Sequence, residues 1–187
     1  MNLLVMTAYY LTFVTSTSYA REAYGASLST AGFTAGIMVI GCLVGRFLTG
    51  NLISIFGSRL ILFSGLLLYV GSLASFFAVN SLPLLFAQRL LAGTGVGIIG
   101  TATGTIIAYV VPQKYHGLGI SLFSLSTALA LALGPFLGIV ITRWCDYAAL
   151  SWTALGVGLG CLIIFFGLHA LPETRHRHRP FFELNSY

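Results

Sequence analysis

Charged residues are scarce in this chain. Only 7% of its 187 residues are Asp, Glu, Lys or Arg, while 57% are hydrophobic, and the mean hydropathy is +0.95. Soluble domains carry about 25% charged residues, and disordered chains combine high charge with few apolar residues. Both classes are therefore excluded, and three cysteines are too few for a disulfide-rich scaffold. A membrane protein is the class that remains.

The few charges divide the chain into long uncharged stretches: 1–20, 23–45, 60–88, 90–113, 115–142 and 147–172. A helix of about 20 apolar residues crosses the hydrocarbon core of a bilayer. We therefore predict an all-α membrane protein, with a six-span bundle over residues 1–171 and a basic cytoplasmic tail over 172–187. The predicted spans are 2–20, 30–50, 60–80, 83–110, 117–142 and 150–171.

The basic residues also predict an orientation. Arg59, Lys114 and the arginines of 172–187 fall on one side of the predicted spans, whereas Arg21 and Arg143 lie beside acids on the other side. Because Lys and Arg are enriched in cytoplasmic loops, we expect both termini to be cytoplasmic in a multi-pass protein of the cell (inner) membrane.

The first twenty residues have a second interpretation. Residues 3–14 are apolar, and Ser18-Tyr19-Ala20 is similar to the cleavage site of a secretory signal peptide. A basic n-region is lacking, however, and the segment carries several hydroxyl groups. Polar groups in a span usually face a bundle interior or a cavity, so we favour a transmembrane helix.

Carboxylates are missing from every predicted span. All four acids, Glu22, Asp146, Glu173 and Glu183, fall in predicted loops or in the tail. No His and carboxylate are placed to activate a Ser or Thr, so we predict that the protein is not an enzyme. We also expect no cofactor, no metal site and no nucleic-acid partner; the expected partners are the lipid bilayer and a small-molecule substrate.

Glycines recur at a spacing of four residues in the apolar stretches. Small residues at this spacing let helices approach closely in lipid. The pairs are Gly32/Gly36, Gly41/Gly45, Gly93/Gly97, Gly100/Gly104 and Gly156/Gly160.

Three short patterns point to a known family. Residues 50–59 are similar to G-x-L-a-D-r-x-G-r-r, residues 89–95 match R-x-x-x-G-x-G, and residues 130–138 are similar to G-x-x-x-G-P-x-x-G. In this order the chain resembles the N-terminal six-helix half of a major facilitator superfamily transporter, with motifs of the exporter-like drug/proton antiporter type. The matching positions, with a nearby arginine, are candidate gating and motif residues: Arg46, Gly50, Gly57, Arg59, Gly93, Gly95, Gly134, Pro135 and Gly138.

This resemblance implies a fold and a function. The fold would be one half of the family's, built from two three-helix repeats, and the chain would export a small solute by alternating access. Spans one and four would line the cavity, and spans two and five would face a partner bundle. The candidate substrate or coupling residues are Tyr9, Tyr10, Thr12, Arg89, Thr94 and Thr101.

Some positions depart from the family pattern or allow two roles. The usual acid of the first pattern is Ser54 here, and the basic residue after it is Ile55. Arg46 and Arg59 either rebuild the gate or anchor the cytoplasmic side. Arg89 either acts in coupling or substrate binding, or snorkels to the interface. Gly134-Pro135 is either a functional bend or a packing kink.

The length leaves three hypotheses open, since family members usually have twelve spans. A second six-helix half encoded elsewhere, or a homodimer partner, would complete the transporter. The chain could instead be an inactive truncated fragment. A hypothesis of another class is a non-transporting membrane interaction subunit.

Overall fold

The computed structural model describes residues 1–167, which are almost entirely helical. Two short 3-10 turns, η1 (Phe76–Ala78) and η2 (Gln113–Tyr115), precede α4 and α5. The predicted tail (172–187) and the last residues of the sixth predicted span lie outside the described residues. The α-helices are α1 (Asn2–Tyr24), α2 (Leu28–Phe56), α3 (Ser58–Ser75), α4 (Leu82–Val110), α5 (His116–Trp144) and α6 (Tyr147–Gly167).

Several helices run past the predicted boundaries because their end signals lie further out. α1 continues through the charged pair Arg21-Glu22 and ends at Gly25, whose φ of 61° is left-handed. The Ser27 side chain then accepts a hydrogen bond from the Thr30 amide at 3.2 Å and starts α2. The connection between these helices is therefore much shorter than expected.

Five helical segments are long and apolar enough to cross a membrane: Leu28–Phe56, Ser58–Ala78, Leu82–Val110, Gln113–Trp144 and Tyr147–Gly167. α1 is not among them, although it has 23 residues. Its hydroxyl side chains lower its hydropathy. Several of them are buried by neighbouring helices, as for Thr12, Thr15 and Ser16, so these hydroxyl groups are not exposed to lipid.

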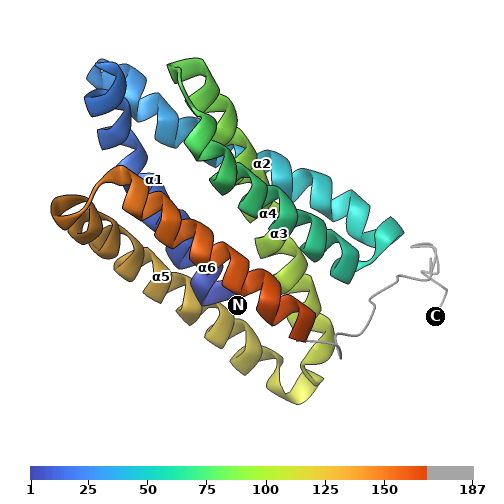
Figure 1. The fold of residues 1–187 in the computed structure, drawn as a ribbon. Coiled ribbons are helices and arrows are strands. Elements are labelled where there is room, and N and C mark those ends of the chain that lie inside the picture. The colour runs from blue at the N-terminus through green and yellow to red at the C-terminus, as the bar shows by residue number, and fades with distance from the viewer. Residues whose placement is uncertain (168–187) are drawn as a thin grey trace.

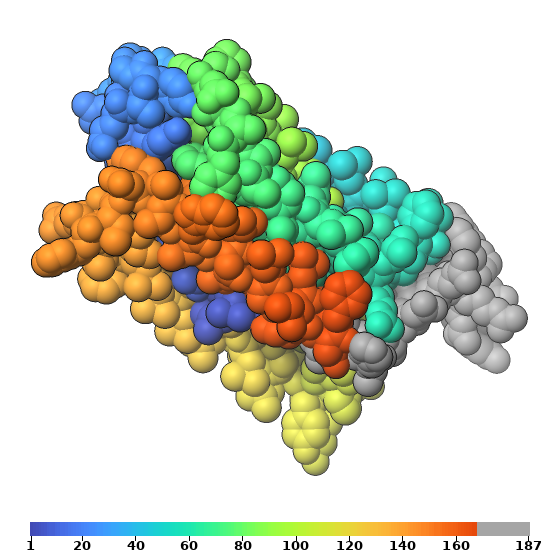
Figure 2. All heavy atoms as spheres, viewed as in Figure 1, coloured from blue at the N-terminus to red at the C-terminus, as the bar shows by residue number. Residues whose placement is uncertain are grey.

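The helices pack in two groups (Figure 1). α4 packs against α2 and α3, and α5 packs against α1. α6 joins the groups by contacting both α1 and α3. In Figure 2, α6 crosses the front of the molecule, and the first residues of α1 reach the surface between α6 and α5. α1 contacts helices of both groups and thus occupies the centre of the bundle.

Glycines bring α2 and α4 together backbone to backbone. A Cβ atom at Gly93 would collide with the Met38 carbonyl oxygen, and one at Gly97 with the Cys42 carbonyl oxygen. From the other side, Gly41 and Gly45 meet the α4 backbone. Two of the five predicted glycine pairs thus form a close interface. The other pairs do not: Gly32, Gly36, Gly104, Gly156 and Gly160 face open space, and Gly100 meets only the end of Met6.

Gly134 and Gly138 likewise let α5 approach α1 closely. A Cβ at Gly134 would lie 2.5 Å from Tyr10 Cβ, and one at Gly138 would lie 2.9 Å from the Leu11 carbonyl oxygen. Pro135 lies between them, and α5 still runs unbroken from His116 to Trp144. This motif therefore packs α5 against α1.

The pattern at residues 50–59 is mostly helical, which corrects the prediction that one span ends at residue 50 and the next begins at residue 60. Gly50 lies inside α2, which continues to Phe56, and α3 begins at Ser58. The turn consists of Gly57, with φ 82° and ψ 154°. This conformation is essentially restricted to glycine, whereas Gly50 has a helical backbone that any residue can adopt.

Replacing Gly57 by Ala is expected to destabilise the protein by about 1–3 kcal/mol, because a Cβ is strained at this φ and ψ. Gly50→Ala is the matched control: Gly50 is exposed, and an added Cβ meets no atom within 4 Å. The control should be neutral or slightly stabilising. Thermal unfolding in detergent measures both, and equal melting temperatures would contradict the prediction.

Gly93→Ala should also destabilise the protein, by about 1–3 kcal/mol, since the added methyl group pushes α4 away from the Met38 carbonyl. Gly104→Ala, on the same helix, has nothing within 4 Å of the new Cβ and should be tolerated. Chemical unfolding in detergent compares the two variants. A Gly104→Ala protein as unstable as Gly93→Ala would exclude helix packing as the cause.

Candidate functional site

A cavity of about 300 Å³ lies among α1, α2, α4 and α5. This volume is at the lower end of the range of small-molecule sites. Its position between the two helix groups follows from the sparse contact between α4 and α5. The lining residues are Met6, Tyr9, Tyr10, Cys42, Arg46, Val96, Gly100, Thr101, Phe123 and Thr127.

The walls combine hydrogen-bonding groups with apolar surface. α1 supplies the phenols of Tyr9 and Tyr10, whose rings meet edge to face at 5.1 Å. Arg46 of α2 brings a guanidinium group, and Thr101 and Thr127 add hydroxyl groups. No carboxylate lines the cavity. Such walls can bind a neutral or anionic solute that has both hydrogen-bonding groups and an apolar face.

Three of the six predicted substrate or coupling residues meet in this cavity. Tyr9, Tyr10 and Thr101 line it, while Thr12, Thr94 and Arg89 do not. The hydroxyl groups of Thr12 and Thr94 bond back to their own helices, at 3.0 Å to the Ala8 carbonyl and 2.9 Å to the Leu90 carbonyl. Because this local bond satisfies a hydroxyl group within a helix, a polar residue in a span need not face a cavity.

Arg89 lies in a different part of the bundle from the cavity. It precedes Thr101 on α4 by twelve residues, which is about 18 Å along a helix. Its guanidinium carbon lies 6.0 Å from the ring centre of Phe76, in the turn before α4. The expectation that Arg89 shares a wall with Tyr9 and Tyr10 is therefore not met.

The Arg89 side chain is 3% exposed, and neither Nε nor Nη1 has a hydrogen-bond partner among the described residues. A buried guanidinium without an anion is strongly unfavourable. Its neighbour Gln88 is better satisfied, since its Nε2 donates to the Ser72 carbonyl at 2.9 Å. The fold holds Arg89 in place but does not neutralise its charge.

Comparison with known proteins identifies the family and the fold of this chain. A profile of the Major Facilitator Superfamily matches residues 1–185. The chain belongs to the major facilitator superfamily. The fold is similar to solved structures of the proton:xylose symporter XylE. One, bound to 6-bromo-6-deoxy-D-glucose, has a TM-score of 0.74 at 19% identity over 92% of this chain and 43% of that one. The inward-open form from E. coli has a TM-score of 0.72 at 22% identity, over 92% of this chain and 46% of that one.

Curated relatives in this superfamily have different named activities. "Azole resistance protein 1" of Saccharomyces cerevisiae is 34% identical over 125 residues, covering 64% of this chain and 20% of that protein. The "Arabinose-proton symporter" of Bacillus subtilis is 26% identical over 162 residues, covering 83% of this chain and 35% of that protein. This major facilitator chain thus spans only about a fifth to a third of the length of these relatives.

The superfamily motif residues take up separate positions. Arg46 lines the central cavity, whereas Arg59 lies in another pocket, 6.0 Å from the ring centre of Phe165. Gly93 and Gly95 pack α4 against two helices, since a Cβ at Gly95 would lie 2.9 Å from the Tyr69 amide nitrogen of α3. Most of the motif glycines therefore serve helix packing, and Arg46 contributes to the site.

The α5 contribution to the cavity was missed from sequence. Thr127 and Phe123 line the cavity, and the Asn2 amide donates to Ser126 Oγ at 2.7 Å and to Thr127 Oγ1 at 3.1 Å. The signal was present as a group of hydroxyl residues in an otherwise apolar span. It could not be assigned without knowing that α5 lies against α1.

Replacing Arg89 by Met tests whether the guanidinium has a structural role. Because an apolar side chain of similar length avoids the cost of an unpaired buried charge, Arg89→Met should be as stable as wild type or more stable. Gln88→Met, by contrast, should lower the free energy of unfolding by about 1 kcal/mol, because it removes the hydrogen bond to the Ser72 carbonyl. Thermal unfolding in detergent compares them, and a clear loss of stability in Arg89→Met would contradict this reasoning.

Proposed function

We propose that this chain is a six-helix half of a secondary transporter and that it moves a small solute by alternating access, around the cavity lined by α1, α2, α4 and α5. The observation that carries the proposal is that cavity, with its two tyrosines, its arginine and its two threonines, in a chain of the major facilitator superfamily. A polar site among membrane helices is costly unless it binds a substrate or an ion.

In this proposal α1 also crosses the membrane and brings the number of spans to six, although it is more polar than the other five helices. The six helices form two repeats of three, α1–α3 and α4–α6, with both termini on the cytoplasmic side of the cell (inner) membrane. The coverage of 43% and 46% of the XylE structures supports the assignment to one half of a larger transporter.

The other half, or a second copy of the chain, would cover α2 and α5. In the most apolar stretch of α5, only 17% of the residues are buried. The corresponding share is 28% for α2 and 44% for α4. Large side chains such as Phe47 and Phe136 are exposed on these two helices. This distribution supports a partner bundle on the α2 and α5 side.

We infer a substrate that is uncharged or anionic, with hydroxyl groups and an apolar face, because the cavity has donors and aromatic rings but no carboxylate. Arabinose, for which one relative is named, has the hydroxyl groups of this class. The glycine and proline pattern of α5 favours export. The carboxylate that proton coupling requires would come from the partner half, because none lines the cavity.

Arg46→Gln tests the site in proteoliposomes that contain the purified chain, with radiolabelled arabinose, xylose and an azole as probes. We expect a KM about tenfold higher, because a charge-assisted hydrogen bond to the solute is lost. Arg143→Gln removes the same charge from an exposed position outside the cavity and should leave transport unchanged.

Light scattering of the same sample separates the remaining hypotheses. A dimer with gradient-driven flux, weakened in Arg46→Gln, would establish a half-size transporter. A folded monomer without flux would identify a fragment that lacks its second half. A folded dimer that carries none of the probes would favour the alternative of a non-transporting membrane interaction subunit.

A further inference from the structure

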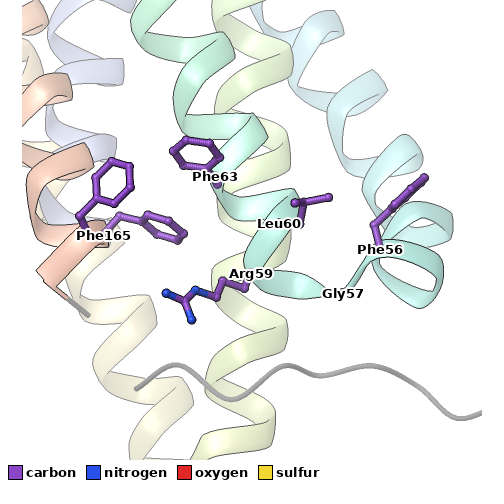
Figure 3. Close-up of a pocket in the computed structure, with 7 residues that line it drawn as sticks. Phe56, Gly57, Arg59, Leu60, Phe63 and Phe165 are labelled. Carbon is purple, nitrogen blue, oxygen red and sulfur yellow. The ribbon is translucent and has the colours of Figure 1, made fainter. Parts of the chain in front are cut away.

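A second pocket lies at the end of the bundle where α3 begins and α6 ends (Figure 3). Its volume is about 330 Å³. Leu60 and Phe63 of α3 form one wall, and Phe165 and Phe166 of α6 form the other, with Phe56 and the Gly57 turn at the rim. This α3–α6 groove shares no residue with the central cavity.

The walls of the α3–α6 groove are mostly aromatic. The ring centre of Phe63 lies 5.5 Å from that of Phe165 and 5.7 Å from that of Phe166. Leu60 and Phe166 remain 55% and 57% exposed, and both belong to helices that can cross a membrane. The groove is thus an apolar recess on a surface that faces lipid.

Arg59 provides the charge of this groove. Its guanidinium carbon lies 6.0 Å from the ring centre of Phe165, and no acid lines the pocket. The two acids of the described residues are remote. Asp146 precedes α6 and is about 30 Å away along that helix, and Glu22 interacts with Tyr147 at the same far end. Among the described residues, the groove therefore has a net positive charge.

We propose that the α3–α6 groove binds an anionic phospholipid, with an acyl chain against the phenylalanines and the phosphate on Arg59. A guanidinium group forms paired hydrogen bonds with phosphate, and basic residues at the ends of membrane helices attract anionic lipids. A soluble anion would gain nothing from the aromatic walls. A zwitterionic lipid carries an ammonium or choline group that the positive groove does not favour.

Native mass spectrometry of the full chain tests this proposal. The protein is purified in detergent and mixed with equal amounts of phosphatidylglycerol and phosphatidylcholine that have the same acyl chains. We expect a preference of about fivefold for phosphatidylglycerol, which is the effect of one arginine near an anionic lipid. The preference should disappear in Arg59→Gln and persist in Arg143→Gln, which removes an exposed charge at the other end of the bundle.

Two further variants distinguish the contribution of the lipid head group from that of the acyl chain. Phe166→Ala removes a contact with the acyl chain and should weaken binding of both lipids equally, while Arg59→Lys keeps the charge and should keep part of the preference. Equal melting temperatures establish that the variants are folded. The proposal is overturned if wild type shows no preference, if Arg59→Gln retains it, or if inorganic phosphate displaces the bound lipid.

Discussion

The close approach of helix backbones is the constraint on which the rest of the structure depends. Apolar side chains gain little by leaving lipid for a protein interior, so helices in a membrane associate through van der Waals contact between small residues. Gly93 and Gly97 place α4 directly on α2, and Gly134 and Gly138 place α5 on α1. Two tight pairs with loose contact between α4 and α5 leave space at their junction, and that space is the central cavity.

Burial of polar groups follows from the same arrangement. α1 packs against α5 and also contacts α2, α4 and α6, so it can carry many hydroxyl side chains at small cost. Some bond to their own helix, as Thr12, Thr15 and Ser16 do, and Tyr9 and Tyr10 face the cavity. Arg89 differs, since its Nε and Nη1 atoms have no hydrogen-bond partner within residues 1–167, and a guanidinium group cannot be satisfied by one carbonyl.

The two pockets have different chemistry because they have different surroundings. The central cavity combines phenols, hydroxyl groups and Arg46 among four helices, which suits a solute with several hydrogen-bonding groups. The α3–α6 groove has aromatic walls and Arg59 at a helix end, which suits a molecule that is half apolar and half charged. Each pocket contains one arginine, and the residues around that arginine determine which kind of molecule the pocket can bind.

The sequence by itself determined the fold class, most of the helices and the glycines at which some of them approach, because uncharged stretches and glycine spacing are local properties. Only the tertiary structure decided which glycine pairs are used, since Gly93 meets a backbone while Gly104, with the same spacing from its partner glycine, meets none. Likewise, Tyr9 and Thr101 share a cavity while Arg89 lies elsewhere. Sequence patterns place a residue on its own helix, but its neighbours depend on how the other helices are rotated and stacked.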